Sequence, residues 1–171
     1  MKKTILISLL FISSLALNAQ NNDSTKTSKF KHSIGLQAGY SSAYGLSYKM
    51  DYNNWGLMTV FSPRITNNSS LYSIGLTGLR TINKEDKASM FLYLGEHIFY
   101  NSYSLDLDLN YISAFGYGMK INFSPKVYLN LQFGLAVNFY KYKYTDYYNI
   151  PRLREGTHLS PDGGIGLFYS F

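Results

Sequence analysis

The chain has 171 residues, of which 46% are hydrophobic, 17% aromatic and only 15% charged, and its formal net charge at pH 7 is +6. This mild positive charge does not suggest a nucleic-acid-binding protein, and the absence of cysteine excludes both disulfide bonds and the lipid anchor of a lipoprotein. Because the mean hydropathy is nonetheless slightly negative, at −0.14, the composition favours a transmembrane β-barrel, in which apolar and polar residues alternate along each strand.

The N-terminal residues predict an export signal. "MKK" is a positive leader, "TILISLLFISSLAL" is an apolar stretch, and "LNAQ" supplies a small-residue cleavage site after Ala19. The apolar stretch is shorter than the ~20 residues that a membrane-spanning helix needs, so we expect cleavage. Removal of Lys2 and Lys3 from the 16 basic residues leaves 14 against 10 acidic residues, a net charge of +4. The expected organisation is a signal peptide at 1–19, a polar segment at 20–30 and a barrel domain at 31–171.

Strand-like segments recur through the rest of the chain, separated by polar or turn-forming residues. Most have about the 9–11 residues that a tilted membrane strand requires, and their number is even, as in bacterial barrels. The eight predicted strands are 31–40, 43–52, 55–62, 71–81, 89–100, 108–122, 126–140 and 162–171. The predicted fold class is all-β: a closed, antiparallel, up-and-down transmembrane barrel of eight strands.

The alternation is clearest in segment 126–140. Its apolar face carries Val127, Leu129, Leu131, Phe133, Leu135, Val137 and Phe139. The opposite face carries mainly Asn, Gln, Gly and Ala, which suit a narrow barrel interior. A soluble barrel would need Lys, Glu and Thr on its water-facing side. We therefore expect the apolar faces of the strands to point outward into lipid.

Segment 89–100 leaves two orientations open. In the first, the residues that face lipid are Met90, Leu92 and Leu94; in the second, they are Phe91, Tyr93 and Phe99. Glu96 points outward near a membrane surface in the first orientation and into the lumen in the second.

The positions of the charged residues predict a polar network inside the barrel. Lys49, Asp51 and Lys120 fall on inward positions, and Glu96 joins them in the second orientation of segment 89–100. Charges inside an eight-stranded barrel commonly pair, and its interior is just wide enough for side chains to fill. We therefore expect these four residues to plug the lumen. The alternative is a narrow pore for ions or small solutes.

The predicted connections differ in length between the two ends of the barrel. If both termini lie in the periplasm, the inner turns are 53–54, 82–87 and 124–126. The outer connections are then 41–42, 63–70, 101–107 and 141–161. Short periplasmic turns and longer outer loops are typical of outer-membrane barrels.

The longest outer segment, 141–161, combines aromatic and basic residues. Such a surface beside a membrane could bind lipid phosphates or a protein partner. Alternatively, the last two strands extend beyond the membrane as a tyrosine-rich hairpin. The candidate surface residues are Lys141, Tyr142, Lys143, Tyr144, Tyr147, Tyr148, Arg152 and Arg154.

The chain ends in "IGLFYSF", in which apolar residues alternate up to an aromatic last residue. This segment resembles the C-terminal signature of bacterial outer-membrane barrels. The "NAQ" end of the signal and the Tyr- and Asn-rich strands resemble small outer-membrane barrels of Bacteroidota, over residues 31–171. The resemblance implies an outer-membrane location, contact with outer-membrane lipid, and a monomer, and the mild net charge predicts no nucleic-acid partner. It also implies insertion by the barrel-assembly machinery through Ile165–Phe171.

A catalytic alternative rests on His158 and Ser160, which share a face of an extended segment. The pair resembles that of the lipid A deacylase barrels, in which His acts as a base toward the Ser hydroxyl. However, Pro161 stands where that family has Asn, and its acidic partner has no counterpart in this chain. Glu155 or Asp162 would have to substitute for it.

The remaining histidines, His32 and His97, are far apart in sequence, and the chain has no Cys and no Asp/Glu cluster at ligand spacing. We therefore expect no metal site and no cofactor. The expected function is a structural or surface-interaction role in the outer membrane, without catalysis.

Overall fold

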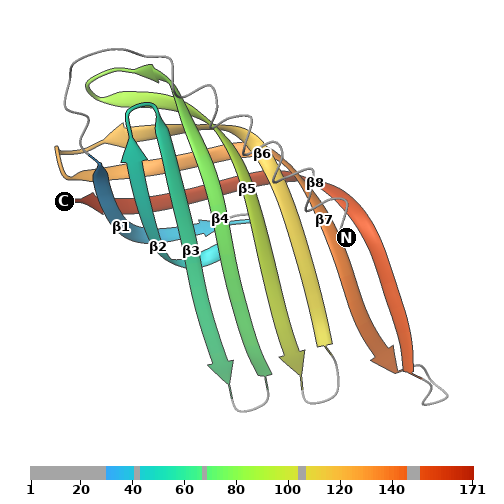
Figure 1. Ribbon diagram of the computed structural model, residues 1–171. Coiled ribbons are helices and arrows are strands. Elements are labelled where there is room, and N and C mark those ends of the chain that lie inside the picture. The colour runs from blue at the N-terminus through green and yellow to red at the C-terminus, as the bar shows by residue number, and fades with distance from the viewer. Residues whose placement is uncertain (1–29, 41–42, 67–68, 104–106, 146–150) are drawn as a thin grey trace.

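The computed structural model describes residues 30–40, 43–66, 69–103, 107–145 and 151–171. They form eight antiparallel strands that close into one barrel, in which each strand pairs with its sequence neighbours and the last pairs with the first (Figure 1). The strands are β1 (Lys31–Gly39), β2 (Ala43–Tyr52), β3 (Trp55–Thr66), β4 (Ser69–Lys84), β5 (Ala88–Tyr103), β6 (Leu107–Asn122), β7 (Val127–Thr145) and β8 (Pro151–Ser170). The predicted fold class is confirmed. Among these residues there is no helix with the length and apolar character to cross a membrane.

Strand β8 closes the barrel against β1. Their register runs from Ser33 opposite Ser170 to Gly39 opposite Gly164. The backbone N–H of Phe171 then donates a hydrogen bond to the carbonyl of His32 at 2.9 Å. Within the seam both strand edges are paired, but β8 from Pro151 to Asp162 pairs with β7 alone, so the projecting part of β8 keeps one open edge.

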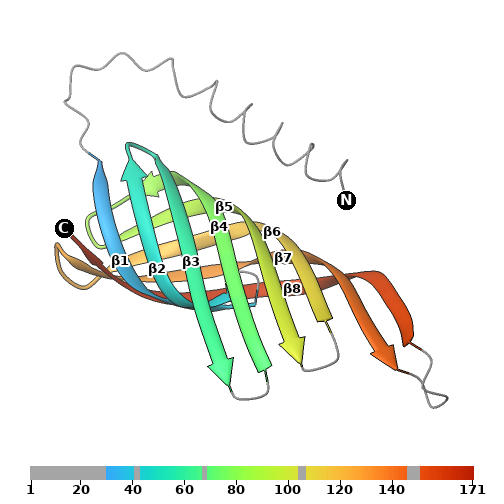
Figure 2. The same cartoon turned by 60° about the horizontal axis from the view of Figure 1, so that its bottom comes forward.

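Three hairpins, β3–β4, β5–β6 and β7–β8, project from the end of the barrel opposite the C-terminus (Figures 1 and 2). In the longest, β7 and β8 pair continuously from Val127 opposite Tyr169 to Thr145 opposite Pro151. The prediction of a loop was therefore wrong for residues 141–145 and 151–161, which continue the two strands as the alternative expected. Backbone hydrogen bonds do not depend on side-chain polarity, so the pairing continues after the apolar alternation ends.

Burial in the barrel is inverted relative to a water-soluble protein. Large apolar side chains on the outer face are exposed, among them Leu36 (68%), Leu46 (64%) and Leu167 (52%). The buried inward positions include many polar side chains: Ser33, Gln37, Ser47, Ser73, Thr77, Asn130 and Gln132. The apolar faces therefore point outward and the amide- and hydroxyl-bearing faces point inward, as the sequence pattern predicted.

Apolar and aromatic side chains fill part of the interior. The rings of Tyr128 and Phe168 are almost fully buried and stack with their centroids 5.3 Å apart. Met58 on β3 belongs to the same buried cluster. An inward glycine makes room for this packing, because a Cβ atom at Gly118 would collide with the ring of Phe91. This part of the interior is therefore a packed core.

Candidate functional site

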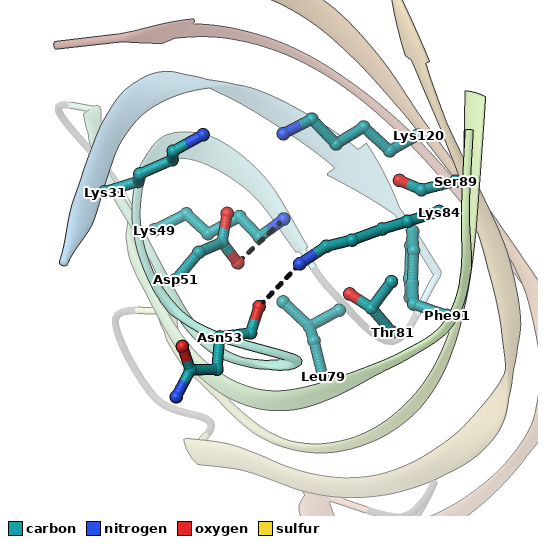
Figure 3. A pocket seen from close by; sticks show the side chains of 10 residues that line it. All are labelled: Lys31, Lys49, Asp51, Asn53, Leu79, Thr81, Lys84, Ser89, Phe91 and Lys120. Carbon is teal, nitrogen blue, oxygen red and sulfur yellow. Dashed lines mark hydrogen bonds and ion pairs between the residues drawn. The ribbon is translucent and has the colours of Figure 1, made fainter. Parts of the chain in front are cut away.

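A cavity of about 240 Å³ lies at the inner end of the barrel, which we define as the end that carries the short turns 53–54, 85–87 and 123–126. Figure 3 labels the ten residues that line it. Asp51 supplies the one carboxylate of the lining. The basic groups of the lining are the ammonium groups of Lys31, Lys49, Lys84 and Lys120.

The register of the strands brings these side chains together from distant parts of the chain. Lys31 on β1 lies opposite Asp51 on β2. Ser89 on β5 lies opposite Lys84 on β4 and, on its other side, opposite Lys120 on β6. Residues that are opposite one another in an antiparallel pair share a face of the sheet, so all five point into the lumen.

Two of the lysines have polar partners. Lys49 is only 4% exposed, and its Nζ lies 3.3 Å from Oδ1 of Asp51. The two residues are two positions apart on β2 and therefore share its inner face. Lys84 donates a hydrogen bond from Nζ to the carbonyl oxygen of Asn53 at 2.9 Å. The ammonium group of Lys49 needs its partner because burial of a charge without one is costly, whereas Lys84 is exposed.

Aromatic rings provide further contacts for the ammonium groups. Nζ of Lys120 lies 3.9 Å from the centroid of the Tyr128 ring. Nζ of Lys49 lies 5.4 Å from the same ring and 5.9 Å from that of Phe91. These cation–π contacts stabilise the lysines without neutralising their charge. The lining therefore holds four lysine amino groups against one carboxylate.

Strand β5 adopts the first of the two orientations considered. Phe91 and Tyr93 are buried and point inward, whereas Met90 is exposed on the outer face. Glu96 also lies on the outer face, where its carboxylate accepts a hydrogen bond from Oγ of Ser113 at 2.7 Å. The prediction that Glu96 belongs to the lumen network was therefore wrong.

The structure brings together the other three residues of the predicted network, Lys49, Asp51 and Lys120. Lys31 and Lys84 were missed. Lys31 begins the first strand at an inward position, so the rule that identified Lys49 could have identified it as well. Lys84 fell within a predicted turn, whereas β4 continues to this residue.

Beyond the cavity, hydrogen-bonded polar pairs occupy the lumen. These pairs are Tyr93 with Asp162, Gln37 with Gln132, and Ser73 with His97. All six residues are at most 7% exposed. Because these side chains are buried and paired across the lumen, their packing argues against a wide water-filled path.

The proposed catalytic pair is not assembled. His158 and Ser160 occupy the same face of β8, as their spacing predicted. However, Oγ of Ser160 has no hydrogen-bond partner among the described residues, and His158 is exposed. Of the two possible acidic partners, Glu155 lies 3.7 Å from Lys141, and Asp162 accepts the hydrogen bond from the lumen tyrosine.

The hairpin formed by β7 and β8 carries the predicted surface residues. Lys141 and Glu155 are opposite one another and form an exposed ion pair. Arg152 and Arg154 are exposed on β8. The structure does not describe the side chains of Tyr142, Lys143 and Tyr144. The last two candidates, Tyr147 and Tyr148, lie outside the described residues.

Aromatic residues mark both ends of the apolar outer face. The rings of Tyr72 and Tyr100, toward the projecting hairpins, have centroids 6.4 Å apart. Trp55, at the inner end, has the guanidinium of Arg80 5.2 Å from its ring. Aromatic belts of this kind are characteristic of the two lipid–water interfaces.

No group of three His, Cys, Asp or Glu side chains within the described ranges could hold a metal ion.

No protein-family model and no curated protein matches the sequence. Among solved structures, the chain is similar to Neisserial surface protein A, with 15% identity, a TM-score of 0.40, and coverage of 85% of this chain and 100% of that one. It is also similar to the Yersinia pestis outer membrane protein Ail in a phospholipid bilayer nanodisc. That similarity has 16% identity, a TM-score of 0.39, and coverage of 84% of this chain and 99% of that one.

Proposed function

We propose that the mature chain is an integral barrel of a bacterial outer membrane, exported with a cleaved signal peptide from a cell of the Bacteroidota type. The observation that carries the proposal is the inverted burial, with Leu36 and Leu46 exposed outside and Asn130 and Gln132 buried inside. A closed barrel also pairs the strand backbones internally, which is the condition for crossing hydrocarbon. The aromatic belts fit the two headgroup levels.

The role that we propose is structural, with the projecting hairpins as a surface for interaction rather than a site of catalysis. These hairpins continue the paired strands beyond the apolar band, where they would meet the cell's surroundings. Conduction is a less favoured alternative, because buried side chains such as Tyr128 and Phe168 occupy the interior. A lipid A deacylase is also less favoured, because Ser160 has no hydrogen bond to His158.

The partners that we propose are outer-membrane lipid and the barrel-assembly machinery. The last strand segment, Ile165–Phe171, forms the seam with β1, so it is the edge that remains available until closure. Its alternate residues Ile165 and Leu167 are exposed on the outer face. Closure pairs the edges of β1 and β8 within the seam, and this part of the barrel therefore offers no edge to a second copy, which supports a monomer.

Refolding of the mature chain with and without detergent tests whether it is a membrane protein. Residues 20–171 would be refolded in neutral detergent and, separately, in buffer without it. We expect the circular dichroism of a β-protein and heat-dependent migration in a gel only with detergent. A protein that stays dissolved and folded without detergent would overturn the proposal, because exposed leucines could not then face lipid.

Single-cysteine labelling tests the orientation, because the chain has no native cysteine. Leu153→Cys lies on the projecting hairpin, and Lys126→Cys lies in an exposed turn at the inner end. On intact cells, we expect a membrane-impermeant maleimide to label the first variant and not the second. The reverse pattern would place the hairpins in the periplasm and refute the surface role.

A further inference from the structure

We infer that the lysine-lined cavity at the inner end of the barrel binds a phosphate group. This inference goes beyond the proposed function and requires only the closed barrel. The four ammonium groups come from β1, β2, β4 and β6, and Figure 3 shows them pointing toward one another across the cavity. Like charges that converge in this way repel each other, so an anion between them would stabilise the arrangement.

The lining of the cavity supplies too little negative charge for its lysines. Asp51 is engaged by Lys49. Lys84 donates to neutral oxygens of the turn at 53–54. Within the described part of the chain, the ammonium group of Lys31 takes part in neither an ion pair nor a hydrogen bond. Three positive charges therefore remain without a carboxylate partner in the lining.

A phosphate group matches this arrangement better than a carboxylate does. It carries up to two negative charges and presents several acceptor oxygens, so ammonium groups on different strands can donate to it at once. Ser89, opposite both Lys84 and Lys120, adds a hydroxyl donor, and Thr81 adds another. A cavity of about 240 Å³ holds a phosphate group together with part of the molecule that carries it.

Two sources of phosphate groups can reach this position. A soluble phosphate ester can enter the cavity from the aqueous side. A phospholipid headgroup can reach it over the rim, because the aromatic belt near Trp55 places the headgroup level at this end of the barrel. Both sources present the same chemistry to the lysines.

The test uses the full mature chain, folded in neutral detergent in phosphate-free buffer. Inorganic phosphate is titrated at constant ionic strength by calorimetry, followed by glycerol 3-phosphate and by a short-chain phosphatidylglycerol. The cavity variant is Lys31→Gln with Lys120→Gln. The matched control is Lys87→Gln with Lys126→Gln, which removes the same charge from exposed turns at the same end of the barrel. We expect saturable binding in wild type and control, and a Kd raised about tenfold or more in the cavity variant.

The outcomes distinguish the two sources of the phosphate group, and they distinguish failed binding from failed folding. Binding of inorganic phosphate and its soluble ester assigns a soluble ligand, and binding of the phospholipid alone assigns a headgroup. If none of the three probes binds saturably, the inference is overturned. Equal weakening in both double variants overturns it too, because net charge alone then attracts the anion. Heat-dependent gel migration shows independently that each variant is a folded barrel, so failed binding is not confused with a failed barrel.

Asp51→Asn provides a second measurement if the cavity variant does not fold. It removes the one carboxylate of the lining, which competes with the anion for Lys49. We expect the Kd for the bound probe to fall several-fold. An unchanged or higher Kd in the folded variant would contradict the inference.

Discussion

The hydroxyl of Tyr93 on β5 donates a hydrogen bond to the carboxylate of Asp162 on β8, although these two strands are not neighbours in the sheet. Both residues are nearly buried, at 5% and 7% exposure. Gly134 makes room for the contact, because a Cβ atom there would collide with the tyrosine hydroxyl. The hydrogen bond therefore connects separate parts of the barrel wall through the interior.

Replacing Tyr93 with Phe should destabilise the barrel. The substitution keeps the ring and removes a donor from a buried carboxylate, for which we expect a loss of about 1–3 kcal/mol in the free energy of unfolding. Denaturant unfolding from lipid vesicles measures it. Tyr117→Phe is the control, because Tyr117 is 55% exposed on the outer face and should change stability little. Equal stability of both variants would show that the interior hydrogen bond contributes nothing.

If the apolar outer face lies in lipid, the stability cost of a charged substitution should depend on its position along β7 and β8. Leu135 and Leu153 are both exposed, at 44% and 50%, but Leu135 lies within the apolar band and Leu153 lies on the projecting hairpin. An arginine near the middle of a bilayer costs about 2–4 kcal/mol in an outer-membrane barrel, and less near the interface. We therefore expect Leu135→Arg to lower the free energy of unfolding by about this amount. Leu153→Arg should be nearly neutral, and equal costs would contradict the placement of the membrane.

Glu96 is an acidic side chain on a face that we assign to lipid. Its carboxylate accepts a hydrogen bond from Ser113, which offsets part of the cost of holding it there. Glu96→Leu should therefore raise the free energy of unfolding in vesicles, by about 1 kcal/mol. Glu96→Gln, which keeps an acceptor for Ser113, is the companion variant and should fall between wild type and Glu96→Leu. A large loss of stability on Glu96→Leu would argue against a lipid-facing position.

The sequence was sufficient to predict the barrel because alternation fixes which face each residue occupies. Leu135 and Gln132 are on opposite faces of β7, and the first is exposed whereas the second is buried, as the alternation requires. The connection between β2 and β3 was also predictable, since the turn at 53–54 contains polar residues between two alternating segments. Asn53 there has a φ of 55°, a conformation that asparagine tolerates well.

Other features depend on information that alternation does not carry. Both faces of β5 are largely apolar, so its orientation, and with it the position of Glu96, is set by how Phe91 and Tyr93 pack inside. The outer ends of β7 and β8 lack an unbroken apolar face, so only their pairing reveals them as strands. The cavity lysines come from four strands, and the register between those strands is a property of the closed barrel.

The last prediction concerns Ser160, which decides between a structural and a catalytic reading of β8. Its Oγ is buried and has no hydrogen-bond partner among the described residues, a state that costs about 1–3 kcal/mol. Ser160→Ala should therefore raise the free energy of unfolding and leave lipid A acylation unchanged. Ser73→Ala is the matched control and should lower stability, because Oγ of Ser73 lies 2.7 Å from Nε2 of His97. Loss of deacylated lipid A in folded Ser160→Ala would instead make Ser160 a nucleophile, since the hydroxyl would then be retained for chemistry at the expense of stability.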